Sequence, residues 1–345
     1  MSVLSGGVFG SAPDDFTELR SLVDEIGARS FESRIGRRSL PDAFDATAWR
    51  HLEEAGLTRL TSTAESGGGP AELAVVLRSL ARHAVSVPLA ETDVLAGWLA
   101  GRAGLEVPEV GPLTVATGLE AVPYAGAAAA VVLTLPDGEG LQVAVRAPET
   151  VTITEGHNAG GEPRDAVTLN APALDTPAGD LVRVDAAAEL TRRGAWARCV
   201  QTIGALDAAV EFSVAHTRER EQFGRPLSAF QAVQHTLATI AGEVERARAA
   251  TDLAVAAAAD HGFDSAQTEF AVTVAKVTLG QVVPTVVTAA HQLHGAIGVT
   301  IEHRLWLATM RARSWISEFG DTAHYARRLG RLTLHADDPW DLIVG

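Results

Sequence analysis

The second half of the chain is dominated by long helical patterns, and these limit the folds that are open to it. From Pro226 onward, apolar side chains recur every three or four positions, at Leu227, Phe230, Val233, Leu237, Ile240 and Val244, which is the spacing of one helix face. Similar patterns run over 187–217, 265–293 and 301–330. They predict a four-helix bundle domain over 186–345, in which Pro284 kinks or splits the third helix.

The chain before the bundle divides into regions of different character. Residues 1–13 are rich in Gly and Ser and predict a flexible tail, whereas 14–108 carry helical patterns. Short β-rich runs separated by turn residues fill 109–185: Leu113–Thr117, Val131–Leu135, Leu141–Val145, Val151–Thr154, Val167–Leu169 and Leu181–Val184. Their spacing predicts a small antiparallel barrel or sandwich. The fold class is therefore α+β, with an N-terminal helical domain, a middle β domain and a C-terminal bundle.

Charge and composition exclude several classes of function. The net charge of −15 disfavours a nucleic-acid partner, because an acidic chain repels phosphate backbones. Glu, Arg, Asp or His interrupts the long apolar stretches well before about 20 residues, which argues against a membrane span. Cys199 is the single cysteine, so the chain has no intrachain disulfide and fits a reducing cytoplasm. No spacing of His, Asp and Glu resembles a metal site.

Two sequence blocks carry a resemblance to a known family. The first is Arg218-Glu-Arg-Glu-Gln-Phe-Gly-Arg-Pro-Leu227, followed by Phe230-Gln-Ala-Val-Gln-His235. The second is His291-Gln-Leu-His-Gly-Ala-Ile-Gly298. Both blocks, and the distance between them, resemble the C-terminal domain of acyl-CoA dehydrogenases. The resemblance extends in outline over the whole chain and is strongest to short actinobacterial members.

The resemblance implies that these blocks hold the nucleotide half of FAD. Arg220 would neutralise the pyrophosphate, because a guanidinium forms planar, charge-assisted hydrogen bonds. Phe223 would pack on the adenosine, with Pro226 starting the next helix. Gln231 would share a helix face with Gln234 and His235. The complete set of implied cofactor residues is Arg220, Gln222, Phe223, Gln231, Gln292, Leu293, His294, Gly295 and Ala296.

The chain departs from the family where the catalytic base is expected. Family members abstract a proton with a Glu before Gly-Thr, and Phe319 occupies that position here. Glu318 is displaced by one residue, which on a helix is a rotation of about 100°. The other family location for the base falls at Gly194 or Ala195, without a carboxylate. Glu318 and Asp321 are therefore weak candidates for a relocated base.

The middle domain departs from the family as well. Relatives carry a Trp-containing strand over the flavin ring, whereas 113–134 contains no Trp. The chain thus retains the residues that hold a neighbour's adenosine and lacks those that hold its own flavin ring. This predicts the shorter subunit of an α2β2 acyl-CoA dehydrogenase, with a longer partner chain that supplies the ring site and the base.

The resemblance further implies an acyl-CoA substrate, in particular a steroid side-chain thioester, and an electron-transfer flavoprotein or similar acceptor. Two alternatives stay open. One is a self-sufficient homotetrameric dehydrogenase that uses Glu318 or Asp321. The other is a stabilising subunit without flavin.

Overall fold

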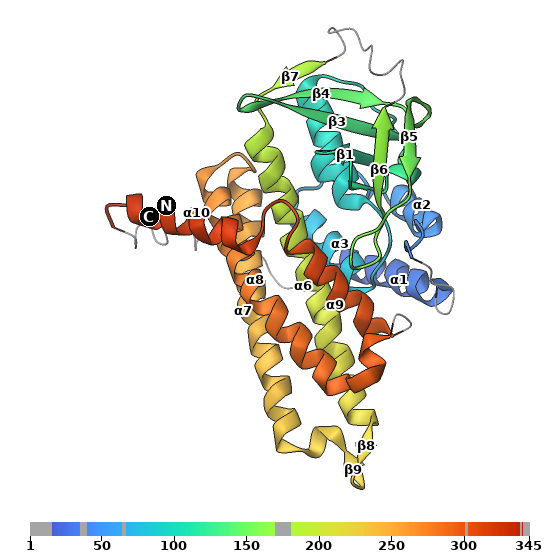
Figure 1. The fold of residues 1–345 in the computed structure, drawn as a ribbon, viewed down its shortest axis with the longest axis vertical. Coiled ribbons are helices and arrows are strands. Elements are labelled where there is room, and N and C mark those ends of the chain that lie inside the picture. The colour runs from blue at the N-terminus through green and yellow to red at the C-terminus, as the bar shows by residue number, and fades with distance from the viewer. Residues whose placement is uncertain are drawn as a thin grey trace.

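The computed structural model describes residues 16–34, 40–63, 67–169, 181–300, 303–338 and 340. Helices come first, a β domain follows, and a helical bundle completes the chain (Figure 1). This is the predicted α+β order. The predicted tail over 1–13 lies outside the described residues.

The N-terminal region consists of short helices that pack against the bundle. Asp45 caps one of them by accepting a hydrogen bond from the amide of Ala48 at 2.9 Å. Pro70 opens another at the favoured first position, with the Glu72 carboxylate accepting from the amide of Gly69. The elements are α1 (Thr17–Arg34), α2 (Ala46–Glu54), α3 (Pro70–Arg82), the π-helical segment η3 (Glu91–Gly97) and α4 (Trp98–Ala103).

The β domain is built from two sheets. The first has the order β1-β3-β4-β7 and the second β2-β6-β5. The strands are β1 (Leu113–Ala116), β2 (Val122–Pro123), β3 (Ala130–Asp137), β4 (Gly140–Arg146), β5 (Val151–Thr154), β6 (Arg164–Leu169) and β7 (Val182–Val184). The strictly antiparallel arrangement predicted from sequence is wrong for one pair, because β1 and β3 run parallel. The chain between β1 and β3 passes through β2 in the second sheet and then returns to the first sheet. The two strands therefore run in the same direction.

The bundle is centred on α6 (Ala187–Glu219), which contacts most of the other long helices. Its neighbours are α7 (Gln231–His261), α8 (Ala266–His294), α9 (Arg304–Trp315) and α10 (Thr322–His335). One stretch, Ala266–Val299, is long and apolar enough to cross a membrane, but 56% of its apolar window is buried. Burial of this kind is expected of a core helix in a bundle. Cys199 is buried in α6, which raises the pKa of its thiol to about 12.

Three helix predictions need correction. The pattern over 301–330 forms two helices, because Phe319 and Gly320 adopt positive φ values of 55° and 104° and break the helix. Pro284 does not split α8. It lies on the exposed side, where water can satisfy the carbonyl that the proline leaves unbonded. Pro226 does not start α7, which begins at Gln231 after a 3-10 turn.

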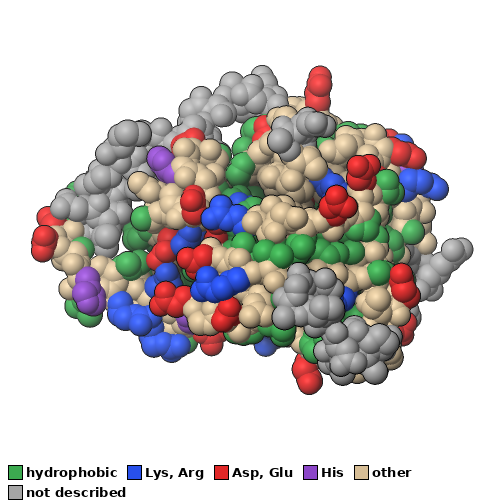
Figure 2. All heavy atoms as spheres, turned by 90° about the horizontal axis from the view of Figure 1, so that it is seen from above, with side chains coloured by type: hydrophobic (Ala, Val, Ile, Leu, Met, Phe, Trp, Pro, Cys, Tyr) green, Lys and Arg blue, Asp and Glu red, His purple; other side chains and the backbone are tan. Residues whose placement is uncertain are grey.

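The end of the molecule that carries the β domain has a mixed surface. Figure 2 views this end from above, and acidic and basic side chains are interspersed beside an apolar band. The net charge of −15 is therefore not gathered into one acidic patch on this face.

Candidate functional site

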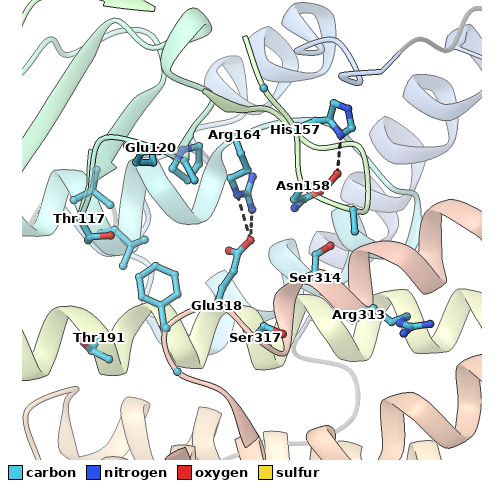
Figure 3. A pocket seen from close by; sticks show the side chains of 18 of the residues that line it. Thr117, Glu120, His157, Asn158, Arg164, Thr191, Arg313, Ser314, Ser317 and Glu318 are labelled. Atoms are coloured by element: carbon cyan, nitrogen blue, oxygen red, sulfur yellow. Dashed lines mark hydrogen bonds and ion pairs between the residues drawn. The ribbon is translucent and has the colours of Figure 1, made fainter. Parts of the chain in front are cut away.

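A cavity of about 1190 Å³ lies between the β domain and the bundle. The β domain contributes the loops around Glu120 and Asn158, and the bundle contributes α6, α9 and the segment between α9 and α10. Figure 3 shows Arg164 and Glu318 meeting inside this cavity, with Arg313 and Glu120 on opposite sides of it. The cavity is larger than most small-molecule sites require.

An ion-pair network forms one wall of the cavity and joins four segments of the chain. Glu318 accepts hydrogen bonds from Arg164 of β6 at 2.7 Å and from Arg198 of α6 at 2.6 Å. Arg198 also pairs with Glu91 of η3 at 2.5 Å. Because Arg164, Arg198 and Glu91 are all buried, these contacts are weakly screened and fix the β domain on the bundle.

The network removes the basicity of Glu318. Burial alone would raise the pKa of its carboxyl group, but Arg198 and Arg164 outweigh burial and lower this pKa to about 2. A general base works best when its pKa lies near the working pH, so Glu318 is poorly suited to abstract a proton. Asp321 caps α10 by accepting from the amide of His324 at 2.7 Å, and its side chain is not among those that line the cavity.

The segment that follows α9 is held by its backbone as well. Lys276, 2% exposed, donates to the carbonyls of Ile316 at 2.9 Å and Glu318 at 2.8 Å. Tyr325 donates to the carbonyl of Phe319 at 2.9 Å. Because the segment is a turn and not a helix, the predicted rotation of Glu318 away from the site is wrong, and Glu318 lines the cavity together with Phe319.

Phe319 fills the space where either expected base would stand. Its ring lies against Gly194, where an added Cβ would come within 2.4 Å of the ring. The phenylalanine keeps this position with a left-handed backbone, which is unfavourable for a residue of its size. The hydrogen bonds of Lys276 and Tyr325 hold the backbone in this strained conformation. The Phe319 ring is therefore a fixed part of the cavity wall.

The first predicted nucleotide block forms a projecting hairpin at the far end of the bundle (Figure 1). Strands β8 (Glu221–Gln222) and β9 (Arg225–Pro226) are joined by Phe223 and Gly224, which both have positive φ, as a two-residue hairpin turn demands. The Phe223 side chain is 91% exposed. Arg220 is exposed at the end of α6, and its guanidinium has no recorded partner among the described residues.

The second block lies at the same end of the bundle. The ring of His294, at the end of α8, stacks on His216 of α6 at a centroid distance of 4.5 Å, and Arg220 follows one turn after His216. Gln231, Gln292, Gly295 and Ala296 are exposed there and Leu293 is half-buried, whereas His294 is buried, with its Nδ1 against the carbonyl of Ala290. His294 is therefore the least accessible of the predicted cofactor residues in this second block.

Gln292 opens onto a groove between α8 and α9 that the sequence did not reveal. This cavity, about 500 Å³, is lined by Gln292, His291, Trp306, Met310 and Arg313 among others. An aromatic ring, an amide and a guanidinium in one groove suit a nucleotide, which needs a stacking surface and a partner for its phosphates. Met310 and Arg313 line the large cavity as well, so the groove adjoins it along α9. Within the described residues, no cluster of His, Cys, Asp and Glu could hold a metal ion.

Comparisons with known proteins agree with this architecture. The family model described as acyl-CoA dehydrogenase, C-terminal domain, matches residues 184–327. Acyl-CoA dehydrogenase IpdE2 of Mycolicibacterium smegmatis is 26% identical over 327 residues, which is 91% of this chain and 98% of that relative.

Solved structures extend the likeness to the whole fold. A chain of the ChsE4-ChsE5 complex from Mycobacterium tuberculosis matches with a TM-score of 0.78 at 24% identity, covering 94% of this chain and 99% of that one. A chain of the Tcur3481-Tcur3483 steroid acyl-CoA dehydrogenase matches with a TM-score of 0.77 at 24% identity, covering 93% and 98%. These structural likenesses establish the fold.

Proposed function

The chain belongs to the acyl-CoA dehydrogenase family, and from this premise we propose that it is the subunit of an FAD-dependent hetero-oligomer that holds the nucleotide end of the cofactor and supplies no base. The observation that carries the proposal is the state of Glu318, the carboxylate beside the family's base position. Two arginines hold it ionised with a pKa of about 2, and Phe319 covers Gly194 at the alternative location.

The residues at the far end of the bundle fit the adenosine half of FAD. Arg220 is an exposed cation without a recorded partner in the described part of the chain, which suits a pyrophosphate. Phe223 is an exposed aromatic ring. A second chain or a nucleotide that covered this ring would remove its apolar surface from water, which is favourable. Gln222, Gln231 and Gln292 add exposed amides on the same end.

Within the complex, this chain's residues bind and orient the nucleotide end of FAD, and they move no proton. Bound FAD supplies hydride-accepting chemistry, while the reactive ring and the base belong to the longer partner chain. The substrate class is an acyl-CoA thioester, and the likeness to a steroid acyl-CoA dehydrogenase supports a steroid side-chain thioester. An electron-transfer flavoprotein or a similar acceptor would reoxidise the complex, which we place in the cytoplasm.

The test is co-expression with the partner chain and measurement of bound FAD by its absorbance. We expect one FAD for each pair of unlike chains. Arg220→Ala should weaken FAD binding about 10- to 100-fold, as expected for the loss of one charge-assisted contact. The matched control is Arg218→Ala, which removes a neighbouring exposed arginine of the same helix end and should leave the FAD content unchanged.

Two results would support the other readings. A yellow preparation of this chain alone that oxidises acyl-CoA would establish a self-sufficient dehydrogenase. Unchanged FAD content in the Arg220→Ala complex would favour a stabilising subunit that contacts no flavin.

A further inference from the structure

A separate cavity of about 460 Å³ lies where the N-terminal helices meet the bundle. Its walls come from α1, α3, α6 and α7. Among the described residues, it shares no lining side chain with the large cavity or with the groove beside Gln292. Its volume lies within the range of small-molecule sites, so it is a candidate for a ligand that the proposed function does not use.

Two kinds of contact frame this cavity. At Gly204 of α6, an added Cβ would come within 2.1 Å of the carbonyl oxygen of Arg78, so the backbones of α3 and α6 lie close together there. Long side chains bridge the helices elsewhere. Asp207 of α6 accepts hydrogen bonds from Arg78 of α3 at 2.8 Å and from Arg248 of α7 at 2.7 Å. The three helices are therefore held in place around the space between them.

The floor of the cavity is apolar. Val200 and Ile203 of α6 and Val255 of α7 are almost completely buried there. Ala71 lines the cavity from the first turn of α3 and leaves room beside it, and Phe16, just before α1, adds an aromatic ring. A lining of this kind suits the apolar body of a small ligand.

Most of the charged groups in the lining are paired with one another. Arg78 and Arg248 share Asp207, and Arg82 pairs with Glu211 at 3.0 Å. Because these charges are compensated within the protein, an ion that entered the cavity would gain little by approaching them.

Two charged groups of the lining remain, and they differ in exposure. Arg20 of α1 is exposed, so water solvates its guanidinium. Asp252 of α7 is half-buried and has no recorded hydrogen bond or ion pair with any described residue. Burial raises the pKa of its carboxyl group, and the charge of Arg78 offsets this only in part. A carboxylate that loses hydration without gaining a partner is unfavourable, so a cation would gain most at Asp252.

We propose that this cavity binds a small organic ammonium ion, with its nitrogen beside Asp252 and its apolar body on the floor that α6 and α7 form. The ligand class is an aryl- or alkylamine. A bound amine would contact both the N-terminal helices and the bundle, and it would stabilise their packing by mass action. The inference goes beyond the proposed function, because the site needs neither a flavin nor a base.

The experiment is calorimetric titration of the co-purified complex with three compounds that differ at one group. Tryptamine carries an ammonium, tryptophol has a hydroxyl in its place, and indole-3-propionate carries a carboxylate. A mildly alkaline buffer keeps Asp252 ionised and the amine protonated. We expect one tryptamine binding event per copy of this chain, with tryptophol weaker by about tenfold or more, as for the loss of one charge-assisted contact. Indole-3-propionate should be the weakest of the three.

Two pairs of variants, made in this chain alone, locate that event. Asp252→Asn removes the charge and keeps the shape, and its control Asp260→Asn changes an exposed carboxylate of the same helix outside the cavity. Ala71→Phe fills the cavity from α3, and its control Ala46→Phe changes an exposed alanine of α2. We expect Ala71→Phe to abolish binding of tryptamine and tryptophol, and both controls to bind as the wild type does.

The charge variant decides the chemistry. Asp252→Asn should weaken tryptamine about tenfold or more and leave tryptophol unchanged, so that the two compounds bind alike. Retained tryptophol binding also shows that the variant is folded. The proposal is wrong if tryptamine gives no event, if Asp252→Asn leaves its affinity unchanged, or if indole-3-propionate binds best, which would place an anion at Arg20. FAD counted on the same preparation tests the proposed function separately, so the two can fail independently.

Discussion

Replacing Glu318 by Gln tests whether this carboxylate is a structural anchor or a base. Its pKa lies at about 2, below the value near 4.3 of an unperturbed glutamate, and a difference of this size corresponds to about 3 kcal/mol. The loss expected for one partner of a buried pair is about 3–5 kcal/mol. The lower end applies here, because Arg198 keeps Glu91 and Arg164 keeps Glu162 at 3.6 Å.

The assay is thermal unfolding of the co-purified complex, with turnover and FAD content measured on the same preparation. A loss of about 3 kcal/mol should lower the midpoint by roughly 5–10 °C. The matched control is Glu120→Gln, because Glu120 is an exposed carboxylate of the same cavity and its replacement should change stability very little. The folded pKa of Glu318 is depressed, so the stability it contributes is complete above pH ~4.5 and disappears as the pH falls toward 2.

The opposite pattern would refute the anchor. If Glu318→Gln abolished turnover while the unfolding midpoint and the FAD content stayed at their wild-type values, Glu318 would be the base. The ion pairs with Arg164 and Arg198 would then have to open during the reaction.

Two further changes probe the cavity wall and the far end of the bundle. Gly194→Ala places a Cβ within 2.4 Å of the Phe319 ring and should destabilise the complex by about 1–3 kcal/mol. The control Gly242→Ala lies in α7 where nothing is within 4 Å, and it should be neutral or stabilising. Equal unfolding midpoints for the two variants would contradict the packing of Phe319 on Gly194. Burial lowers the pKa of His294 to about 4, so folding favours the neutral ring. The free energy of unfolding should therefore fall as the pH drops from 6.5 to 4, by about 2 kcal/mol at pH 5. His294→Asn should flatten this part of the stability profile measured by urea unfolding, and an unchanged slope would exclude His294 as its source.

The sequence predicted the elements whose signals are local. Helical periodicity located the bounds of α6 and α8 to within about two residues, and the β-rich runs over 131–135 and 141–145 located β3 and β4. Local patterns say little about how strands pair, so the parallel β1–β3 pair was missed. The positive φ of Phe319, which ends the fourth helical pattern early, depends on contacts from distant segments and has no local signature.

The candidate site shows the same division. The two proposed nucleotide blocks could be located by resemblance, because the residues of each block are contiguous. Arg164 and Arg198 could not be connected with Glu318 from the sequence, since they lie 154 and 120 positions away from it. Trp306 and Arg313 were missed because only the packing of α9 on α8 brings them beside Gln292.

The position of Glu318 changes the reasoning about why this chain would lack a base. From the sequence, the carboxylate was expected to point away from the site because of a shift by one residue. In the structure it lines the cavity, and its reactivity is removed by charge and not by direction. A carboxylate that only pointed away could be restored by a small backbone change. One that carries two arginines cannot become a base without withdrawing a carboxylate from two buried cations, which would then keep only Glu91 and Glu162 as partners, and this is costly. The fold of this chain would therefore stabilise the proposed division of labour between unlike chains.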